Sequence, residues 1–244
     1  MRGLATSLSR VAPSPPAASA STLPLVFCLA LVFAISLVVL VPAAGAALPE
    51  LLPVDDAVRQ PDFFTFRVQL QAAVARHDTA GVIAALDPGV RLSFGGHGGL
   101  ADFRTMWLAS DRIEGLWREM GAVLALGGSF QSPTSFVAPY VFSEWPSQGA
   151  DGFDHVAVIG SSVRVRAEPR VDASVIARVS YKIVAVGSGA PARGSEAREW
   201  VAVRLEDGAH GYISRAYVRS PVDYRMLFSK TRRGWVVDSF VAGD

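Results

Sequence analysis

Cysteine is almost missing from the 244-residue chain, and its single copy is Cys28. One cysteine cannot form an intramolecular disulfide, so the folded part must be stabilised by burial of apolar surface. If the segment that carries Cys28 is removed after export, the remaining protein also has no thiol nucleophile and no thiolate metal ligand. Enzymes that depend on a catalytic cysteine are then excluded.

Acidic residues are missing from residues 1–46, whose only basic residues are Arg2 and Arg10. A long apolar stretch at residues 23–41 follows the two arginines. A basic start, an apolar core and small residues near a cleavage point are typical of an export signal. We predict a signal peptide cleaved after Ala46; the alternative is an uncleaved anchor in the inner membrane, formed by residues 23–41. Both interpretations place the rest of the chain outside the cytoplasm, in the periplasm or the extracellular space.

A dominant charge of either sign is also missing, because the net charge of the whole chain is +1. Residues 47–150 hold 11 acidic and 7 basic residues, whereas residues 151–244 hold 11 acidic and 14 basic residues. A nucleic-acid-binding domain is expected to have a dominant basic patch. This balance therefore argues against a nucleic-acid partner.

Motifs for metal, phosphate or nucleophilic chemistry are missing as well. The histidines are scattered, and neither a His-Glu-x-x-His motif nor a Gly-x-Ser-x-Gly elbow occurs. The glycine-rich run at residues 93–99 lacks the Gly-Lys-Ser/Thr ending of a phosphate-binding loop and is interpreted as a strand-to-helix turn. We therefore predict no metal, no cofactor and a protein that is not an enzyme.

The part that follows the leader has helical patterns first. Apolar residues at three- and four-residue spacings predict a helix over residues 61–76. Asp78 is the expected cap of a second, short helix that runs through Leu86. Alternation then predicts a strand at residues 90–94, and further helical turns are expected within residues 100–107.

A longer helix is expected next. Asp111 and Glu114 have the spacing of a capping box at its start, and Gly127-Gly128 is expected to end it. Residues 135–142 are predicted to be a strand, at a sheet edge because this stretch contains a proline.

From about residue 154 the sequence changes to short β-type runs: HVAVI, VRVRA, SVIARVS, KIVAVG, WVAVRL and GYIS. Asp207-Gly208 favours a tight hairpin turn between the last two runs, because glycine adopts positive φ at no steric cost. The polar stretch at residues 187–199 is expected to be a flexible loop. This spacing of runs predicts the strands of a small barrel.

The stretches at residues 163–179 and 200–218 resemble a bacterial SH3-like domain. VRVRA matches the opening strand of that family, and WVAVRL followed by GYI matches its final hairpin. The resemblance covers about residues 154–220 and implies a small all-β barrel. It also implies a module outside the cytoplasm that binds cell-wall polymers or peptides, or that positions a neighbouring catalytic domain.

The chain continues with two more β-type runs, residues 225–229 and 235–241, which an SH3-like barrel does not need. We infer that this hairpin packs back onto residues 47–150, so that residues 222–244 complete the first domain. Helices combined with such a final hairpin are similar to the cone fold of the nuclear transport factor 2-like and SnoaL-like families, which include both enzymes and inert binding domains. The predicted fold class is α+β: a helix-rich N-terminal domain closed by a C-terminal β-hairpin, plus a small SH3-like barrel.

Basic and aromatic residues gather in the SH3-like segment. Arg164 and Arg166 project to one face of a predicted strand. A surface of arginines and aromatic rings suits an anionic glycan or an acidic peptide. The competing interpretation is that the rings pack in the barrel and the arginines form a solvated strand face. The candidate ligand-binding residues are Arg164, Arg166, Arg170, Trp200, Tyr212 and Tyr217.

An alternative site is an acid/base pair of His97 and Asp102 in the first domain. It would make the protein a hydrolase or isomerase that uses the SH3-like module for docking. The competing interpretation of His97 is a capping or solvent-exposed residue.

The sequence as a whole predicts an exported, non-enzymatic binding protein of the bacterial envelope. Its expected partner is a wall polymer or an envelope protein or peptide, and the membrane is contacted only through an uncleaved leader.

Overall fold

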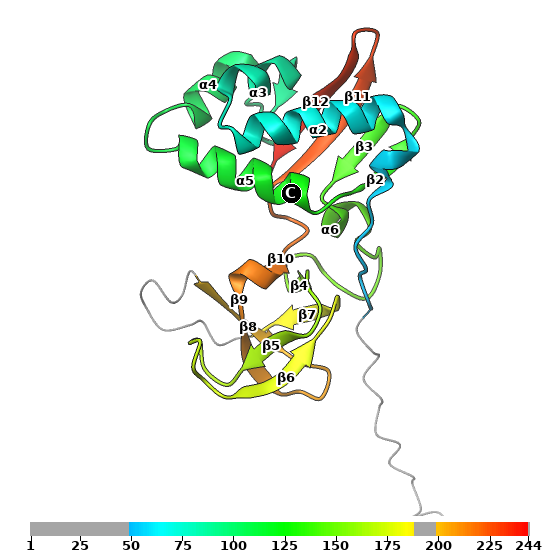
Figure 1. Ribbon diagram of the computed structural model, residues 1–244. Helices are drawn as coiled ribbons and strands as arrows, with labels where there is room; N and C mark the ends of the chain where they lie inside the picture. Colours follow the sequence, from blue (N-terminus) through cyan, green and yellow to red (C-terminus); the bar gives the residue numbers. More distant parts are fainter. Residues whose placement is uncertain (1–48, 188–198, 244) are drawn as a thin grey trace, which may run out of the picture. The chain divides into compact units, whose positions relative to one another are not determined.

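The computed structural model describes residues 49–187 and 199–243, which belong to one compact unit, Gly45–Asp244. The predicted leader, its cleavage point and most of the predicted loop at residues 187–199 lie outside the described residues. The predicted α+β class is confirmed, because the described residues form five α-helices, a five-stranded mixed sheet and a seven-stranded antiparallel sheet (Figure 1). None of these helices has the length and the apolar character needed to cross a bilayer.

The α-helices of the described residues all precede the seven-stranded sheet in the sequence. A short 3-10 helix, η1, comes first at Asp56–Arg59. The α-helices are α2 (Pro61–Ala75), α3 (Thr79–Ala85), α4 (Gly99–Trp107), α5 (Ile113–Ala125) and α6 (Tyr140–Ser143). The predicted cap of the second helix is confirmed, since the Asp78 carboxylate accepts a hydrogen bond of 2.9 Å from the Gly81 N–H.

The end of the chain forms the centre of the five-stranded sheet (Figure 1). The strand order is β1-β12-β11-β3-β2. The C-terminal hairpin, β11 with β12, lies between β1, which pairs parallel to β12, and β3, which pairs antiparallel to β11. The first sheet is therefore complete only when the last residues of the chain have joined it. Its strands are β1 (Leu86–Arg91), β2 (Ser129–Ser132), β3 (Ser135–Ala138), β11 (Arg225–Thr231) and β12 (Gly234–Val241).

One carboxylate joins this hairpin to the start of α2. The Lys230 Nζ lies 2.6 Å from the Asp62 carboxylate, and the Trp235 Nε1–H donates to the same carboxylate at 3.2 Å. The hydrogen bond from Lys230 lowers the pKa of Asp62. An acidic residue in the first turn also suits the positive end of the helix dipole. The Asp62 carboxylate is therefore stabilised by Lys230 and Trp235 and by the start of α2.

Aromatic rings fill the space between α2 and the sheet. The Phe63 ring lies 4.3 Å from the Phe136 ring, 5.4 Å from the Phe228 ring and 4.8 Å from the Trp235 ring, measured between centroids. Tilted and edge-on contacts of this kind stabilise beyond the area that they bury.

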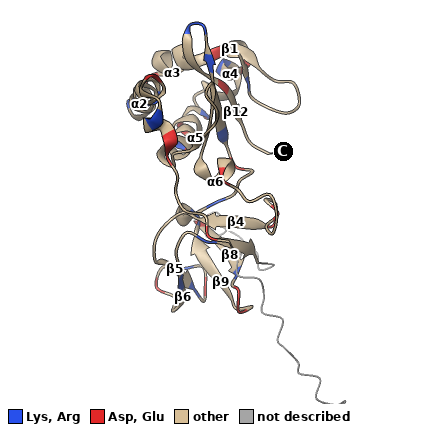
Figure 2. Cartoon of the chain, turned by 90° about the vertical axis from the view of Figure 1, so that its right-hand side faces the viewer, with Lys and Arg blue, Asp and Glu red and all other residues tan. Residues whose placement is uncertain are grey.

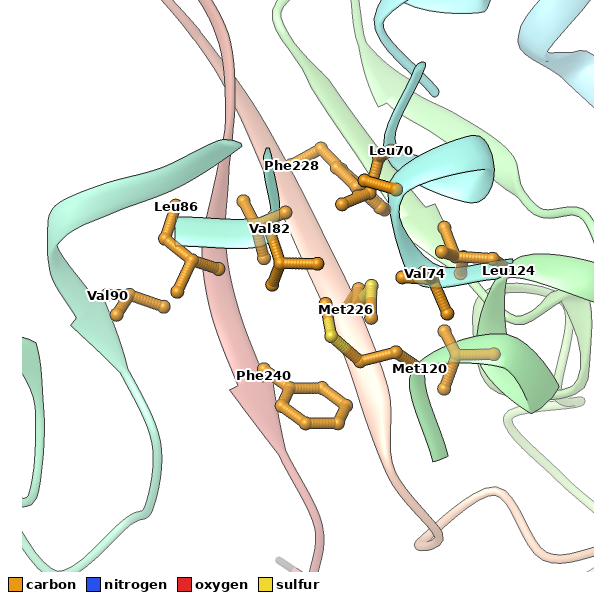
Figure 3. Packing of buried hydrophobic residues seen from close by; sticks show 14 of the residues in the cluster. Leu70, Val74, Val82, Leu86, Val90, Met120, Leu124, Met226, Phe228 and Phe240 are labelled. Carbon is orange, nitrogen blue, oxygen red and sulfur yellow. The ribbon is translucent and has the colours of Figure 1, made fainter. Parts of the chain in front are cut away.

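The apolar faces of α2 and α5 meet over the same hairpin (Figure 3). Leu70 and Val74 of α2, Met120 and Leu124 of α5, and Met226 of β11 are all buried in one cluster. Three- and four-residue spacing places each helical pair on one side of its helix. The interior of this region is therefore a filled apolar core.

The start of α5 differs from the prediction. Arg112, not Asp111, is the residue before the helix, and its side chain makes no capping hydrogen bond. The Ile113 N–H donates instead to the Ala109 carbonyl at 3.1 Å, so the preceding turn already satisfies this donor. The predicted capping box of Asp111 and Glu114 is thus wrong.

The predicted end of α5 is confirmed. Gly127 has a φ of +64°, in the left-handed region that glycine enters without strain. A Cβ at Gly128 would collide with the Val137 carbonyl oxygen, because β3 passes close to this turn. The two glycines allow the chain to leave the helix and return along β2.

Two strand predictions need correction. Strand β1 covers residues 86–91 instead of 90–94, and it tolerates Pro88 because it is an edge strand. The strand predicted at residues 135–142 ends at Ala138, and a helical turn follows after Pro139, whose nitrogen has no hydrogen to donate to a ladder. This strand is also not at an edge, since β3 lies between β11 and β2.

The seven-stranded sheet contains one strand for each of the six predicted β-type runs, and a seventh strand, β10, that was not predicted. Its order is β10-β4-β7-β8-β9-β5-β6. The predicted small barrel is not found in residues 155–186 and 200–219, because the outer strands β10 and β6 are not paired with each other. Strand β6 cannot pair with β7, which follows it in the sequence, since β4 and β8 already occupy both sides of β7. The strands are β4 (His155–Val158), β5 (Val163–Arg166), β6 (Val175–Val179), β7 (Ile183–Val186), β8 (Trp200–Arg204), β9 (His210–Ser214) and β10 (Val218–Arg219).

The hairpin turn predicted at Asp207-Gly208 is confirmed. Gly208 has a φ of +83°, and its N–H donates to the Leu205 carbonyl at 3.0 Å. Val201 and Val203 of β8 belong to a separate buried cluster made mainly of valines. The hairpin is therefore part of the core of this sheet.

A buried ion pair joins the start of the described chain to α2. Arg67 is 5% exposed, and its Nη1 and Nη2 donate to the two Asp55 carboxylate oxygens at 2.7 and 2.6 Å. Asp55 also accepts from the Ala57 N–H at 3.2 Å and so caps η1. The pair gives the buried guanidinium a counter-charge and partners for both Nη atoms, while the Arg67 Nε has no hydrogen-bond partner among the described residues.

Replacing Asp55 with alanine should destabilise the protein. Breaking a fully buried pair costs about 3–5 kcal/mol, and because the Asp55 carboxylate is partly exposed we expect a loss of about 2 kcal/mol. Urea unfolding of the chain from Ala47 to Asp244 measures this loss. Arg59→Ala, which removes an exposed pair with Asp56, is the matched control and should change stability by less than about 0.5 kcal/mol. Equal losses in the two variants would contradict this account of the buried pair.

Tyr140 is buried without a hydrogen-bond partner for its hydroxyl among the described residues. It packs in a small cluster with Leu51, Val141, Ala157 and Ile183. Burial raises the pKa of Tyr140 to about 12, with a smaller contribution from Tyr181.

The free energy of unfolding should therefore fall as the pH rises from 10 to 12. In this window the unfolded tyrosine has lost its proton while the folded one keeps it. Tyr140→Phe should reduce the fall, and at pH 7 it should leave stability equal or raise it by about 1 kcal/mol, because an unpaired hydroxyl is removed. Unfolding curves at pH 7, 10 and 11 test this, with the exposed Tyr217→Phe as the control. An unchanged alkaline slope in Tyr140→Phe would refute the assignment.

Candidate functional site

A pocket of about 550 Å³ is lined by basic and aromatic side chains of the seven-stranded sheet. Arg164, Arg166, Arg178, Trp200 and Tyr217 define what we call the arginine groove. The remaining lining residues are serine or valine, so no carboxylate lines the groove in the described part of the chain. Its electrostatic character is therefore set by three guanidinium groups.

Alternation along β5 explains why an arginine faces the groove. Val163 and Val165 are buried in the valine core, and Arg164 between them is exposed on the other side of the strand. Strands β5 and β6 are neighbours (Figure 2). They are antiparallel, and their register places Arg164 directly opposite Arg178. Two like charges therefore stand side by side, an arrangement that is destabilising in a sheet.

The three arginines differ in what their side chains already bind. The Arg166 Nη1 donates to the Ala173 carbonyl at 2.6 Å, and the Arg178 Nη1 donates to the Ser162 carbonyl at 3.3 Å. The Arg164 side chain has no hydrogen bond or ion pair with any described residue. Because a guanidinium has several N–H donors, all three side chains keep donors for a ligand.

The two aromatic residues of the groove are exposed to different degrees. Trp200 is 6% exposed, and its backbone pairs with Ser214 on β9. Tyr217, in the short 3-10 helix η2 (Arg215–Tyr217), is 53% exposed. Trp200 thus has the burial expected of a packing residue, whereas the Tyr217 ring is free to contact a ligand.

Two of the six candidate residues lie outside this lining. Arg170 follows β5 and forms ion pairs with Glu168 at 3.1 Å and Asp172 at 2.6 Å. These carboxylates, Glu168 foremost, raise the pKa of Arg170. Tyr212 is the backbone partner of Arg166 on the neighbouring strand β9 but is not a lining residue. The other four candidates, Arg164, Arg166, Trp200 and Tyr217, share the groove.

The alternative pair, His97 and Asp102, lies on the surface. The His97 Nδ1 is 3.7 Å from the nearest Asp102 oxygen, and the side chains are 69% and 43% exposed. Asp102 accepts a hydrogen bond of 2.9 Å from the Gly98 N–H, at the start of α4. This is the role of a residue that caps a helix start, and a solvated pair has no shielded site for proton transfer.

A second pocket, of about 490 Å³, lies between α2 and α5. His77 stacks on Trp117 there, with ring centroids 4.9 Å apart, and Glu114 and Arg118 are among the other lining residues. Neither His97 nor Asp102 lines it. No group of three His, Asp or Glu side chains among residues 49–187 and 199–243 is arranged to hold a metal ion.

Arg178 is the residue that the sequence prediction missed. Its signal was present in the spacing, because folding residues 163–179 as one hairpin about a central loop places residue 164 opposite residue 178. The pattern of SVIARVS predicts a strand but does not by itself specify the strand with which it pairs. The groove depends on that register.

No protein-family model, curated protein or solved structure matches this chain. A function has to be inferred from the chemistry of the groove and from the resemblance described for residues 154–220.

Replacing Gly211 with alanine should disturb the sheet beneath the groove. A Cβ there would lie 2.6 Å from Val165 Cγ1 and 3.0 Å from the Arg166 carbonyl oxygen, which belongs to the backbone and cannot rotate away. We expect a loss of about 2 kcal/mol, typical of an overpacked core, in urea unfolding. Gly95→Ala, where the nearest atom is 3.8 Å away, is the control and should unfold like the wild type. A Gly211→Ala variant of unchanged stability would contradict the close approach of β9 to β5.

Proposed function

We propose that this protein is an exported, non-enzymatic binding protein of the bacterial cell envelope, and that its SH3-like module binds an anionic partner in the arginine groove. The partner is a wall polymer or an acidic segment of an envelope protein. One observation carries the proposal: Arg164 and Arg178 are directly opposite each other in a groove to which the described residues contribute no carboxylate.

The arginine pair destabilises the sheet but can stabilise a bound anion. Two guanidinium groups opposite each other repel and so cost stability, and neither has an acidic partner among the described residues. An anion placed between them would relieve the repulsion and would accept charge-assisted hydrogen bonds. Nearby Arg170 shows the contrast, because Glu168 and Asp172 already neutralise it.

The resemblance of residues 154–220 to bacterial SH3-like domains supports the same function. Members of that family commonly act outside the cytoplasm as modules that bind wall polymers or peptides. The leader at residues 1–46 suits export to the periplasm or the extracellular space, or anchoring in the inner membrane by residues 23–41. A binding module and an export signal in one chain favour a partner in the envelope.

The structure of the first region favours binding over catalysis. The space between the helices and the five-stranded sheet, where a cone fold would hold a substrate, contains packed rings such as Phe63, Phe136 and Phe228. His97 and Asp102 are exposed to solvent. A hydrolase or isomerase that uses this pair would need a shielded pocket with converging polar groups.

Sedimentation with purified peptidoglycan that keeps its attached polymers tests the proposal. The chain from Ala47 to Asp244 should sediment with this material, and Arg164→Ala with Arg178→Ala should weaken the apparent affinity at least tenfold. The effect should be larger at low salt, because screening of exposed charges is then weaker.

Arg170→Ala is the matched control, since Arg170 is an exposed arginine of the same segment outside the groove. Its binding should stay within about twofold of the wild type, as expected for a charge that is already paired. Equal binding by the double variant and the wild type would contradict the proposed surface. If neither the double variant nor Arg170→Ala binds more weakly than the wild type, another part of the chain binds the peptidoglycan.

A further inference from the structure

We infer that the anionic partner carries phosphate groups, in a polymer joined by phosphodiesters, and that Arg164 and Arg178 hold one such group between them. This inference rests on the proposed function of the arginine groove and specifies its ligand.

The register of β5 and β6 brings the two side chains to one place. Residues directly opposite in an antiparallel pair have Cβ atoms about 5 Å apart and point to the same face of the sheet. Arg164 and Arg178 are such a pair, and both are exposed. Their guanidinium groups can therefore approach a single anion from two sides.

The shape of the anion decides between phosphate and carboxylate. A carboxylate accepts one bidentate guanidinium fork across its two oxygens, and its remaining lone pairs lie in the same plane at its outer edges. Two guanidinium groups that approach from opposite sides therefore cannot both form a fork with it. A phosphodiester keeps two free oxygens, each with lone pairs on several sides of its P–O bond, so two guanidinium groups on opposite sides can each donate to it. Two opposed arginines, in a groove to which the described residues contribute no carboxylate, therefore match a phosphodiester better.

The rest of the groove suits the uncharged links of a polymer. The half-exposed Tyr217 ring offers a flat apolar surface to a polyol or sugar, and Ser161 and Ser214 add hydroxyl groups to the lining. Arg166 can bind a neighbouring phosphate, because only one of its nitrogens is engaged, by the Ala173 carbonyl. A concave site of about 550 Å³ accepts a chain more readily than a flat bilayer surface. A polymer is therefore favoured over phospholipid headgroups.

Calorimetric titration with three probes tests the ligand class. The chain from Ala47 to Asp244 is titrated with poly(glycerol phosphate), with polygalacturonate of similar length, and with vesicles that contain phosphatidylglycerol. We expect the phosphodiester polymer to bind at least tenfold more tightly than the polycarboxylate at physiological salt. We also expect it to bind more tightly than the vesicles. Equal affinity for the two polymers, or a preference for the polycarboxylate or the vesicles, would overturn the inference.

A charge-preserving variant separates geometry from charge. Arg164→Lys with Arg178→Lys keeps both positive charges but removes both forks, so the preference for phosphate should fall at least tenfold. Arg170→Lys, an exposed arginine outside the groove, should keep the wild-type preference. Retention of the preference by the double lysine variant would show that charge alone selects the ligand and would refute the paired-arginine site.

The result also distinguishes this inference from the function on which it rests. If peptidoglycan sediments the protein through Arg164 and Arg178 but the phosphate polymer shows no advantage, the binding function stands and the phosphate assignment fails. If neither peptidoglycan nor any probe binds through the groove, both fail.

Discussion

The pairing of β11 with both β12 and β3 is the constraint on which the rest of the structure depends. It places the last strands of the chain in the middle of a sheet whose other strands lie before residue 139. The chain must therefore leave the first sheet, form the seven-stranded sheet and return. The Asp62 carboxylate, bound by Lys230 and Trp235, fixes the returning hairpin against α2.

The seven-stranded sheet is built so that this return is possible. Its first strand, β4, pairs antiparallel with its last, β10, with Val158 opposite Val218. The points of entry and exit therefore lie side by side. The Ser220 hydroxyl donates to the Gly152 carbonyl at 3.2 Å and joins the two connecting segments. A segment with adjacent ends can be carried within another fold without opening its sheet.

The arginine groove shows a conflict between local stability and binding. Strand alternation buries Val163 and Val165 and leaves Arg164 outside, while the register adds Arg178 directly opposite. The repulsion between the two arginines lowers the stability of the free protein, and an anion bound between them would neutralise it. Natural sequences are locally consistent except where function demands otherwise, and under the proposed function this pair of arginines is such an exception.

Much of the local structure was predictable, because short-range chemistry determines it. Apolar spacing identified α2 and α5, the Asp207-Gly208 turn identified a hairpin, and Asp78 identified a cap. The predictions of the capping box and of the barrel were wrong, because both depend on contacts that the local sequence pattern does not specify. At the start of α5 the Ala109 carbonyl accepts a hydrogen bond from the Ile113 N–H, and no side-chain cap is formed. In the seven-stranded sheet the outer strands β10 and β6 are not paired with each other.

The sequence alone determined four of the five α-helices among the described residues, most of the strands, the Asp207-Gly208 turn and four of the side chains that line the groove, since periodicity and glycine placement act over a few residues. Tertiary structure alone decided that the final hairpin lies at the centre of the first sheet and that the second sheet stays open among the described residues. It also decided that Arg178 stands opposite Arg164. These features depend on which strand edges remain free when distant segments meet, and strand pairing between distant segments leaves little trace in the local pattern.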